Sequence, residues 1–175
     1  QLITGTYENE ERKSWADFRA KYDERVIDVM GSESRATAKI SLSNFERVAK
    51  PKLIKSVTTE LVDRFISARR KERGSRKGTT LSAATINRDL RYLRAALRKA
   101  KAWKYISDVP EFSLLRERKK LPTVVPPEHF AAIYEACNNA EYPSGLPNLN
   151  PADWWRAIIV TAFMTGWRIS QILSL

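Results

Sequence analysis

Five cationic side chains recur at helical spacing near the middle of the chain, and groups of this kind bind phosphate. They are Arg88, Arg91, Arg94, Arg98 and Lys99. At about 100° per residue they fall on one side of a helix, with an apolar stripe roughly opposite. The stripe consists of Ile86, Leu90, Leu93, Leu97 and Ala100. A helix with one core face and one cationic face fits a nucleic-acid groove, although a solvated arginine-rich helix has the same local pattern.

The net charge of the chain is concentrated around this helix. The 175 residues carry a net charge of +11, and residues 67–106 alone carry 13 basic and 2 acidic residues, which is also +11. The preceding loop, Arg69–Thr80, contributes six of those basic residues. A surplus concentrated in this way is typical of a protein that binds a phosphate backbone. A membrane surface is the competing polyanion, but it favours a wider exposed apolar face than this narrow stripe.

The elements that must position these cations are predicted to be helices, because no segment shows sustained alternation of apolar and polar residues. The cationic helix is expected over residues 82–102, with Ser82 as its N-cap. Before it, one helix opens at Ser14, one covers about residues 34–49, and one is capped by Thr58. Their predicted inward faces are Trp15, Phe18, Tyr22, Val26 and Val29; Ala38, Leu42, Phe45 and Val48; and Leu61, Val62, Phe65 and Ile66. This pattern predicts a compact all-α four-helix bundle.

The composition changes after this bundle, which indicates a second domain. Residues 1–13 are interpreted as a polar lead-in, 14–106 as the bundle, 107–125 as a linker and 126–175 as the start of the second domain. Since the chain starts without methionine and stops within a predicted helix, we expect it to be a piece of a longer protein. A domain cut in this way would leave Ile158, Ile159, Phe163 and Leu173 without partners and prone to self-association.

The single cysteine, Cys137, excludes an internal disulfide and indicates a reducing compartment. No signal peptide is visible, and no apolar run approaches the roughly 18 residues of a membrane span. These features predict a cytoplasmic protein that does not associate with a membrane.

Arg168 is a second candidate for phosphate chemistry. It follows a strongly apolar predicted helix and the Thr165-Gly166 turn, and it should begin the next helix. An arginine buried beneath an apolar helix must find an anion or strong acceptors. A phosphate would satisfy it through bidentate hydrogen bonds, whereas a salt bridge to a carboxylate would make it a purely structural residue.

At this point the chain resembles the tyrosine recombinases, the phage-integrase family. The segment AIIVTAFMTGWRISQILSL resembles the family's first catalytic motif, and SAATINRDLRYLRAALRKAKAWKYISDVP is similar to the last helix of its core-binding domain. The following linker and PPEHFAAIYEAC look like the start of its catalytic domain. The resemblance covers nearly all of residues 14–175. It implies a SAM-like four-helix core-binding bundle followed by a truncated, helical start of a recombinase catalytic domain.

The resemblance also implies an activity. In such enzymes a tyrosine attacks the scissile phosphodiester and forms a phosphotyrosyl link, without metal or nucleotide cofactor, in a tetramer on two paired DNA sites. Only Arg168 can be carried over as a catalytic residue, since all six tyrosines of this chain precede it. We therefore expect this chain to bind DNA without cutting it, in a bacterial or phage-encoded protein associated with the nucleoid. The family often has a carboxylate where Gln171 stands, and a smaller or aliphatic residue where Trp167 stands.

The resemblance places the second and fourth helices of the bundle against the major groove. The candidate DNA contacts are Arg35, Thr37, Lys39 and Ser43 on the second helix; Arg76, Lys77 and Thr80 in the loop; and Thr85, Asn87, Arg88, Arg91, Arg94 and Arg98 on the fourth. Most of these should touch phosphates, which determine position and affinity. Asn87 and Arg88 are the better candidates for base edges, because asparagine matches adenine and arginine matches guanine.

Two other functions remain open at this stage. The chain could be a non-catalytic helical DNA-binding regulator, which a downstream His-x-x-Arg motif and tyrosine would exclude. It could also be a helical protein-interaction module whose cationic helix meets an acidic partner. That module would bind duplex DNA weakly.

Overall fold

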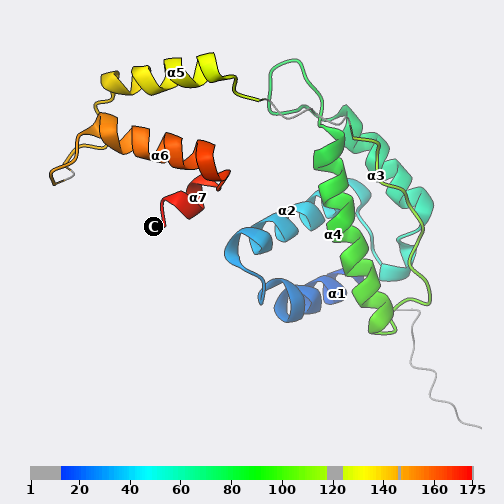
Figure 1. Ribbon diagram of the computed structural model, residues 1–175. Helices are drawn as coiled ribbons and strands as arrows, with labels where there is room; N and C mark the ends of the chain where they lie inside the picture. The colour runs from blue at the N-terminus through cyan, green and yellow to red at the C-terminus, as the bar shows by residue number, and fades with distance from the viewer. Residues whose placement is uncertain (1–12, 118–123, 146, 175) are drawn as a thin grey trace, which may run out of the picture. The chain divides into compact units, whose positions relative to one another are not determined.

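The computed structural model describes residues 13–117, 124–145 and 147–174, and every regular element in them is helical (Figure 1). The α-helices are α1 (Trp15–Tyr22), α2 (Ser32–Ala49), α3 (Thr59–Lys71), α4 (Ala83–Ala102), α5 (Pro127–Ala136), α6 (Pro151–Thr165) and α7 (Ile169–Ile172). The predicted all-α fold is confirmed for these residues. The chain forms two compact units, residues 1–118 and 119–175, and their boundary lies inside the predicted linker. The predicted lead-in, apart from Lys13, lies outside the described residues.

In the first unit α4 packs against both α2 and α3 (Figure 1). The predicted apolar stripe of α4 is fully buried, and it meets Leu42 and Phe45 of α2 and Phe65 of α3 in one core. The N-caps predicted at Thr58 and Ser82 are confirmed, and Ser14, where the sequence predicts the start of a helix, caps α1 in the same way. The hydroxyl oxygens of Ser14, Thr58 and Ser82 accept backbone N–H bonds at 3.0, 3.3 and 3.2 Å. Each such cap stabilises its helix by about 1 kcal/mol.

The first helix departs from the predicted pattern near its end. Residues Asp23–Ile27 form a π-helical turn, in which the N–H of Asp28 donates to the carbonyl of Asp23 at 2.8 Å. This wider turn shifts the later side chains around the helix axis. Ile27 is consequently fully buried, and Val29, which the period of 3.6 placed in the core, is 78 % exposed.

The first half of the predicted linker lies on the first unit. We call Asp108–Glu117 the strap. It begins near the C-terminal end of α4, where Asp108 pairs with Lys101 at 2.9 Å, and Leu115 then bonds to Asn87 near the N-terminal end. Val109, Phe112 and Leu115 pack against the core. The strap therefore runs antiparallel to α4, and these residues belong to the first unit instead of forming a free connection.

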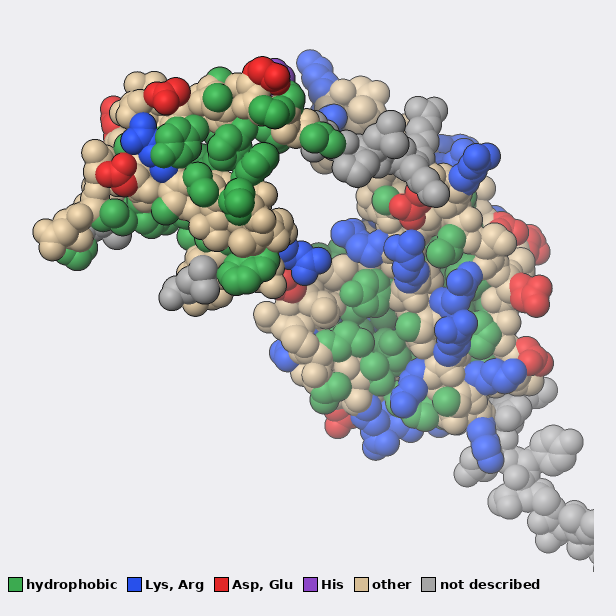
Figure 2. Space-filling model, viewed as in Figure 1, with side chains coloured by type: hydrophobic (Ala, Val, Ile, Leu, Met, Phe, Trp, Pro, Cys, Tyr) green, Lys and Arg blue, Asp and Glu red, His purple; other side chains and the backbone are tan. Residues whose placement is uncertain are grey.

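The second unit buries little of its apolar surface. Cys137, Ala152, Ile158 and Ile172 are the buried apolar residues among those described in this unit. The sequence predicts that Ile158, Ile159, Phe163 and Leu173 lack partners, but Ile158 is buried and Ile159 is half-buried. Phe163 and Leu173 are 54 % and 58 % exposed, and the Phe163 ring lies 4.3 Å from that of Phe130. Apolar side chains accordingly form much of the visible surface of this unit (Figure 2). Across the described part of the chain, no helix is both long and apolar enough to cross a membrane.

Candidate nucleic-acid interface

The outer side of α4 is cationic. Arg88, Arg91, Arg98 and Lys99 are exposed and Arg94 is half-buried. Lys and Arg side chains form a row over α4 in the space-filling view (Figure 2). The buried stripe positions this row, because a helix that packs one face on α2 and α3 turns the opposite face to solvent.

The strap divides these cations into two groups. Arg91 pairs with Glu117 at 3.3 Å, and Arg94 donates to the carbonyl of Phe112 and stacks on its ring at 4.7 Å. Arg88 and Arg98 make no ion pair or hydrogen bond with any residue that the structure describes, and Lys99 only approaches the Trp103 ring at 5.6 Å. We call Arg88, Arg98 and Lys99 the free cations. They are available to an external anion without breaking an internal bond.

The loop before α4 is a tight hairpin, residues 72–81. The N–H of Leu81 donates to the carbonyl of Glu72 at 3.0 Å, and the N–H of Gly74 donates to that of Thr79 at 2.8 Å. A Cβ on Gly74 would lie 2.7 Å from the Thr80 carbonyl oxygen, so this position requires glycine. The predicted contacts Arg76, Lys77 and Thr80 are all exposed on the hairpin. The hairpin therefore presents Arg76 and Lys77, together with the exposed Arg73, on a hydrogen-bonded turn ahead of α4.

A buried ion network anchors this hairpin, and sequence reasoning missed it. The sequence predicts Arg69 in the loop, but α3 continues to Lys71 and Arg69 is only 4 % exposed. Its guanidinium donates to the Asp89 carboxylate of α4 at 2.8 Å and also pairs with Glu72. The Arg47 guanidinium of α2 donates to the same Glu72 carboxylate at 2.8 Å. The available signal was Asp89, an acidic residue in the buried phase of α4 between Ile86 and Leu90. A buried carboxylate requires a cationic partner.

Three effects in this network act on the pKa of Glu72. Partial burial disfavours its charged form, but the hydrogen bond from Arg47 and the charges of Arg69 and Arg47 outweigh burial. The pKa of Glu72 is therefore held below its usual range. The carboxylate at the base of the hairpin is ionised at neutral pH and joins α2, α3 and the hairpin.

The α2 candidates are mostly engaged within the protein. The Arg35 guanidinium donates to the carbonyl of Met30 at 3.1 Å, and the Thr37 hydroxyl donates to that of Glu33 at 2.9 Å. Lys39 pairs with Asp28 at 2.9 Å, and this hydrogen bond lowers the pKa of Asp28. Ser43 is exposed and makes no side-chain hydrogen bond to the described residues. Among these four, Ser43 has no internal bond to a described residue, and the exposed Arg35 guanidinium keeps donors that its single bond to Met30 does not use.

Asn87 is not free to read a base, which corrects the prediction. It is 1 % exposed, its Oδ1 accepts from the N–H of Leu115 at 2.7 Å, and its Nδ2 donates to the Leu115 carbonyl at 2.9 Å. The position lies between the cationic face and the core, where the strap covers it. Thr85 is half-buried, with its hydroxyl 2.9 Å from that of Ser82. Arg88 is the remaining candidate for a base edge.

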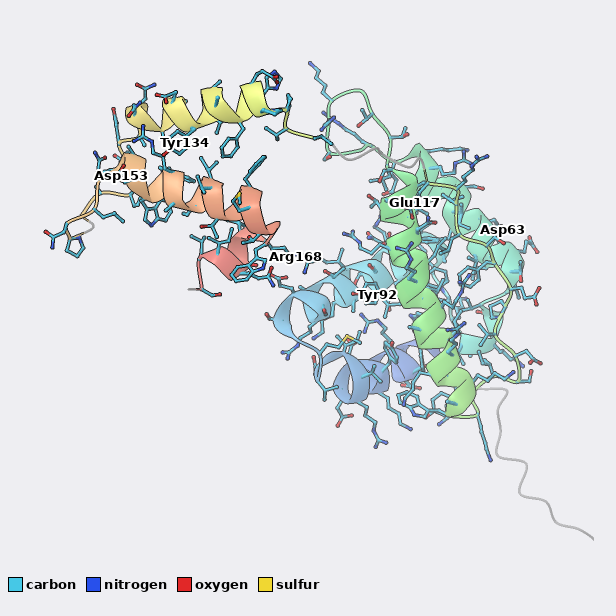
Figure 3. All side chains as sticks on the ribbon, in the orientation of Figure 1. Asp63, Tyr92, Glu117, Tyr134, Asp153 and Arg168 are labelled. Atoms are coloured by element: carbon cyan, nitrogen blue, oxygen red, sulfur yellow. The ribbon has the colours of Figure 1, made fainter. Side chains whose placement is uncertain are left out.

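Arg168 is exposed at the N-cap of α7 (Figure 3), although the sequence placed it beneath a buried helix. The end of α6 does not cover it, since Phe163 and Met164 are themselves exposed. Its backbone N–H donates to Oε1 of Gln171 at 3.0 Å, and its guanidinium makes no ion pair with the described residues. Because Arg168 is exposed, its charge does not require a bound anion. Its proposed phosphate role depends on the motif alone.

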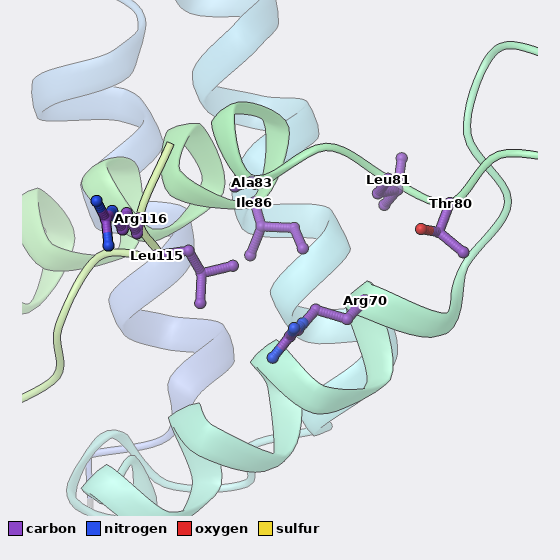
Figure 4. A pocket seen from close by; sticks show the side chains of 7 residues that line it. All are labelled: Arg70, Thr80, Leu81, Ala83, Ile86, Leu115 and Arg116. Atoms are coloured by element: carbon purple, nitrogen blue, oxygen red, sulfur yellow. The ribbon is translucent and has the colours of Figure 1, made fainter. Parts of the chain in front are cut away.

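A hollow of about 430 Å³ lies at the start of α4 (Figure 4). Its lining residues are Arg70, Thr80, Leu81, Ala83, Ile86, Leu115 and Arg116. Arg70 and Arg116 are exposed cations that sequence reasoning did not select. They extend the cationic surface from α4 to the end of α3 and to the strap. The described residues contain no cluster of His, Cys, Asp or Glu side chains suited to a metal ion.

Comparison of the chain with protein-family models, with curated proteins and with solved structures finds no match in any of the three. A functional proposal for this chain must therefore depend on its geometry, its charge and its sequence motifs.

Proposed function

We propose that the first unit binds double-stranded DNA. The observation that carries this proposal is the set of free cations along the exposed face of α4, a helix that directly follows the hairpin with its exposed Arg76 and Lys77. Cations gathered without internal partners repel one another, and a polyanion relieves that repulsion. A helix of 20 residues is about 30 Å long and has the diameter that a major groove admits.

Within this proposal, the chain is the SAM-like core-binding bundle and the start of the catalytic domain of a site-specific tyrosine recombinase. The order of the parts supports it: a helical unit with a cationic fourth helix, then an apolar helix, the Thr165-Gly166 turn and Arg168. Arg168 would bind the scissile phosphate in a tetramer on paired DNA sites. The chain itself would bind DNA without cleaving it, since no tyrosine follows Arg168. A protein that contains this chain should carry a His-x-x-Arg motif and then a tyrosine after it, and their absence there would leave the DNA-binding regulator.

The proposal is tested by the salt dependence of affinity for a 30-base-pair duplex, measured by fluorescence anisotropy. A log–log slope of about −4 to −7 is expected if five to eight phosphates are neutralised. A flat slope, or no binding at low salt, would reject DNA as the partner and favour an acidic protein.

A matched pair of triple variants assigns the binding to α4. Arg88→Gln, Arg98→Gln and Lys99→Gln together should weaken binding roughly tenfold or more and make the slope less steep by about 2.7. Lys52→Gln, Lys55→Gln and Arg64→Gln remove the same charge from exposed positions outside α2, α4 and the hairpin. This control should change affinity by less than about threefold, and equal losses in both triples would reject α4 as the interface.

A further inference from the structure

Glu117 holds a carboxylate oxygen against two donors of α4. Its Oε1 accepts from Nδ2 of Asn87 at 2.6 Å and from the guanidinium of Arg91 at 3.3 Å. An arginine and an amide N–H that converge on one carboxylate oxygen present the donors that a phosphate oxygen also accepts from. The Glu117 side chain is 40 % exposed, so an anion from solvent can replace it. Glu117 lies beside the N-terminal part of α4 (Figure 3).

Asn87 keeps one donor fixed at this position. One hydrogen of its Nδ2 points to the Leu115 carbonyl and the other to Glu117. The amide cannot turn away, because its Oδ1 also accepts the N–H of Leu115 at 2.7 Å. When Glu117 leaves, a buried N–H has lost its acceptor, and a buried donor without an acceptor is costly. The Asn87 donor therefore favours a bound anion both before and after Glu117 is displaced.

We propose that Arg91 and Asn87 form a binding site for a DNA backbone phosphate, and that Glu117 fills this site when DNA is absent. This inference rests on the proposed DNA-binding function. On binding, the phosphate displaces the Glu117 carboxylate, while the Leu115 bonds to Asn87 and the Phe112 contact with Arg94 hold the rest of the strap in place. Glu117 thus competes with the DNA phosphate and lowers the affinity of the first unit for DNA.

The test compares Glu117→Gln with Glu111→Gln in the complete chain. Glu111 is an exposed acid of the same strap that makes no ion pair or hydrogen bond with the described residues, so its loss changes the net charge equally. Glu117→Gln should tighten binding to the duplex roughly fivefold and steepen the salt slope by about 0.9, because Arg91 then carries no internal counterion. Glu111→Gln should tighten binding by less than about twofold and leave the slope unchanged.

A double-mutant cycle with Arg91→Gln isolates the site. In the wild-type background, Arg91→Gln should weaken duplex binding by less than about twofold. When DNA binds, wild-type Arg91 exchanges its contact with Glu117 for a contact with a phosphate, so the net contribution of Arg91 to affinity is small. In the Glu117→Gln background, Arg91→Gln should weaken binding roughly tenfold. The Arg91 and Glu117 side chains are 59 % and 40 % exposed, and urea midpoints close to that of the wild type would show that the variants fold.

Two results separate the inference from the function on which it rests. If the wild-type chain binds DNA with a steep salt slope but Arg91→Gln acts equally in both backgrounds, the phosphate site is wrong and the DNA-binding function stands. Equal effects of Glu117→Gln and Glu111→Gln would also overturn the site. If no variant binds the duplex even at low salt, both the function and the site are wrong.

Discussion

The two units of the chain differ in how much of their apolar side chains they bury. In the first unit α4 places Leu90 and Leu93 at full burial, and all of the largest fully buried side chains among the described residues belong to this unit. In the second unit α6 leaves Phe163 and Met164 54 % and 76 % exposed. Apolar content alone therefore does not make a core, which also needs neighbouring faces that cover it.

The difference extends to the charged groups. The first unit holds an arginine at its centre, where Arg69 bonds Asp89 and Glu72, and this network joins the cationic hairpin to the core. The second unit has the pair Arg156–Asp153 at 3.4 Å, with the Asp153 side chain 59 % exposed. A closed core can hold cations in defined positions, and the first unit does so with the hairpin and α4. Four paired experiments test this contrast.

The largest contrast should come from removing the same side chain in each unit. Leu93→Ala should lower the free energy of unfolding of the first unit by about 2–5 kcal/mol, because a buried leucine leaves a cavity. Leu173→Ala should cost less than about 0.5 kcal/mol, because Leu173 is 58 % exposed. Urea unfolding followed by circular dichroism measures both. Similar losses would show that the second unit also has a closed core.

Charge removal should give the second contrast. Asp89→Asn should cost about 3 kcal/mol, because it removes the buried one of the two carboxylates that pair with the Arg69 guanidinium. Asp153→Asn should cost at most about 1 kcal/mol, since water screens an exposed pair. The same urea titration reads both values. A small cost at Asp89 would mean that the network contributes little to the core.

DNA affinity should separate the two arginines singled out by sequence. Arg88→Gln is expected to weaken duplex binding about fivefold and to make the salt slope less steep by about 0.9, as for one lost phosphate contact. Arg168→Gln should change affinity by less than about twofold, because Arg168 is proposed to bind a phosphate in the tetramer on paired DNA sites and not in the complex with a single duplex. Anisotropy titrations at two salt concentrations suffice. Equal losses would indicate that the second unit shares the binding surface.

The smallest expected effect is on the pH dependence of stability. Because the folded-state pKa of Glu72 lies below its ordinary value of 4.5, its contribution to stability is complete above that value and is lost as pH falls through the folded pKa. Glu72→Gln should therefore reduce the loss of stability between neutral and acidic pH. Glu135→Gln in the second unit is the control. If both variants unfold in acid as the wild type does, Glu72 does not contribute to acid sensitivity.

Local signals in the sequence were sufficient for most of the helices. The caps Thr58 and Ser82, the start of a helix at Ser14 and the buried stripe of α4 follow from neighbours within one or two turns, and all were confirmed. The misplaced Val29 follows from the π-helical turn, which a uniform helical period cannot represent. The positions of Arg69, Asn87 and the strap depend on contacts between residues 20 to 30 positions apart. Spacing along a single helix contains no information on such partners.

The sequence by itself determined which residues are cationic, that they gather around one helix, and which side of that helix they share. These properties follow from composition and from the angle that each residue takes around a helix axis. Only the tertiary structure decided which of these cations are free. The strap engages Arg91 and Arg94, whereas Arg88, Arg98 and Lys99 stay open to solvent. A helical period specifies direction, but what a side chain meets in that direction depends on how distant segments pack.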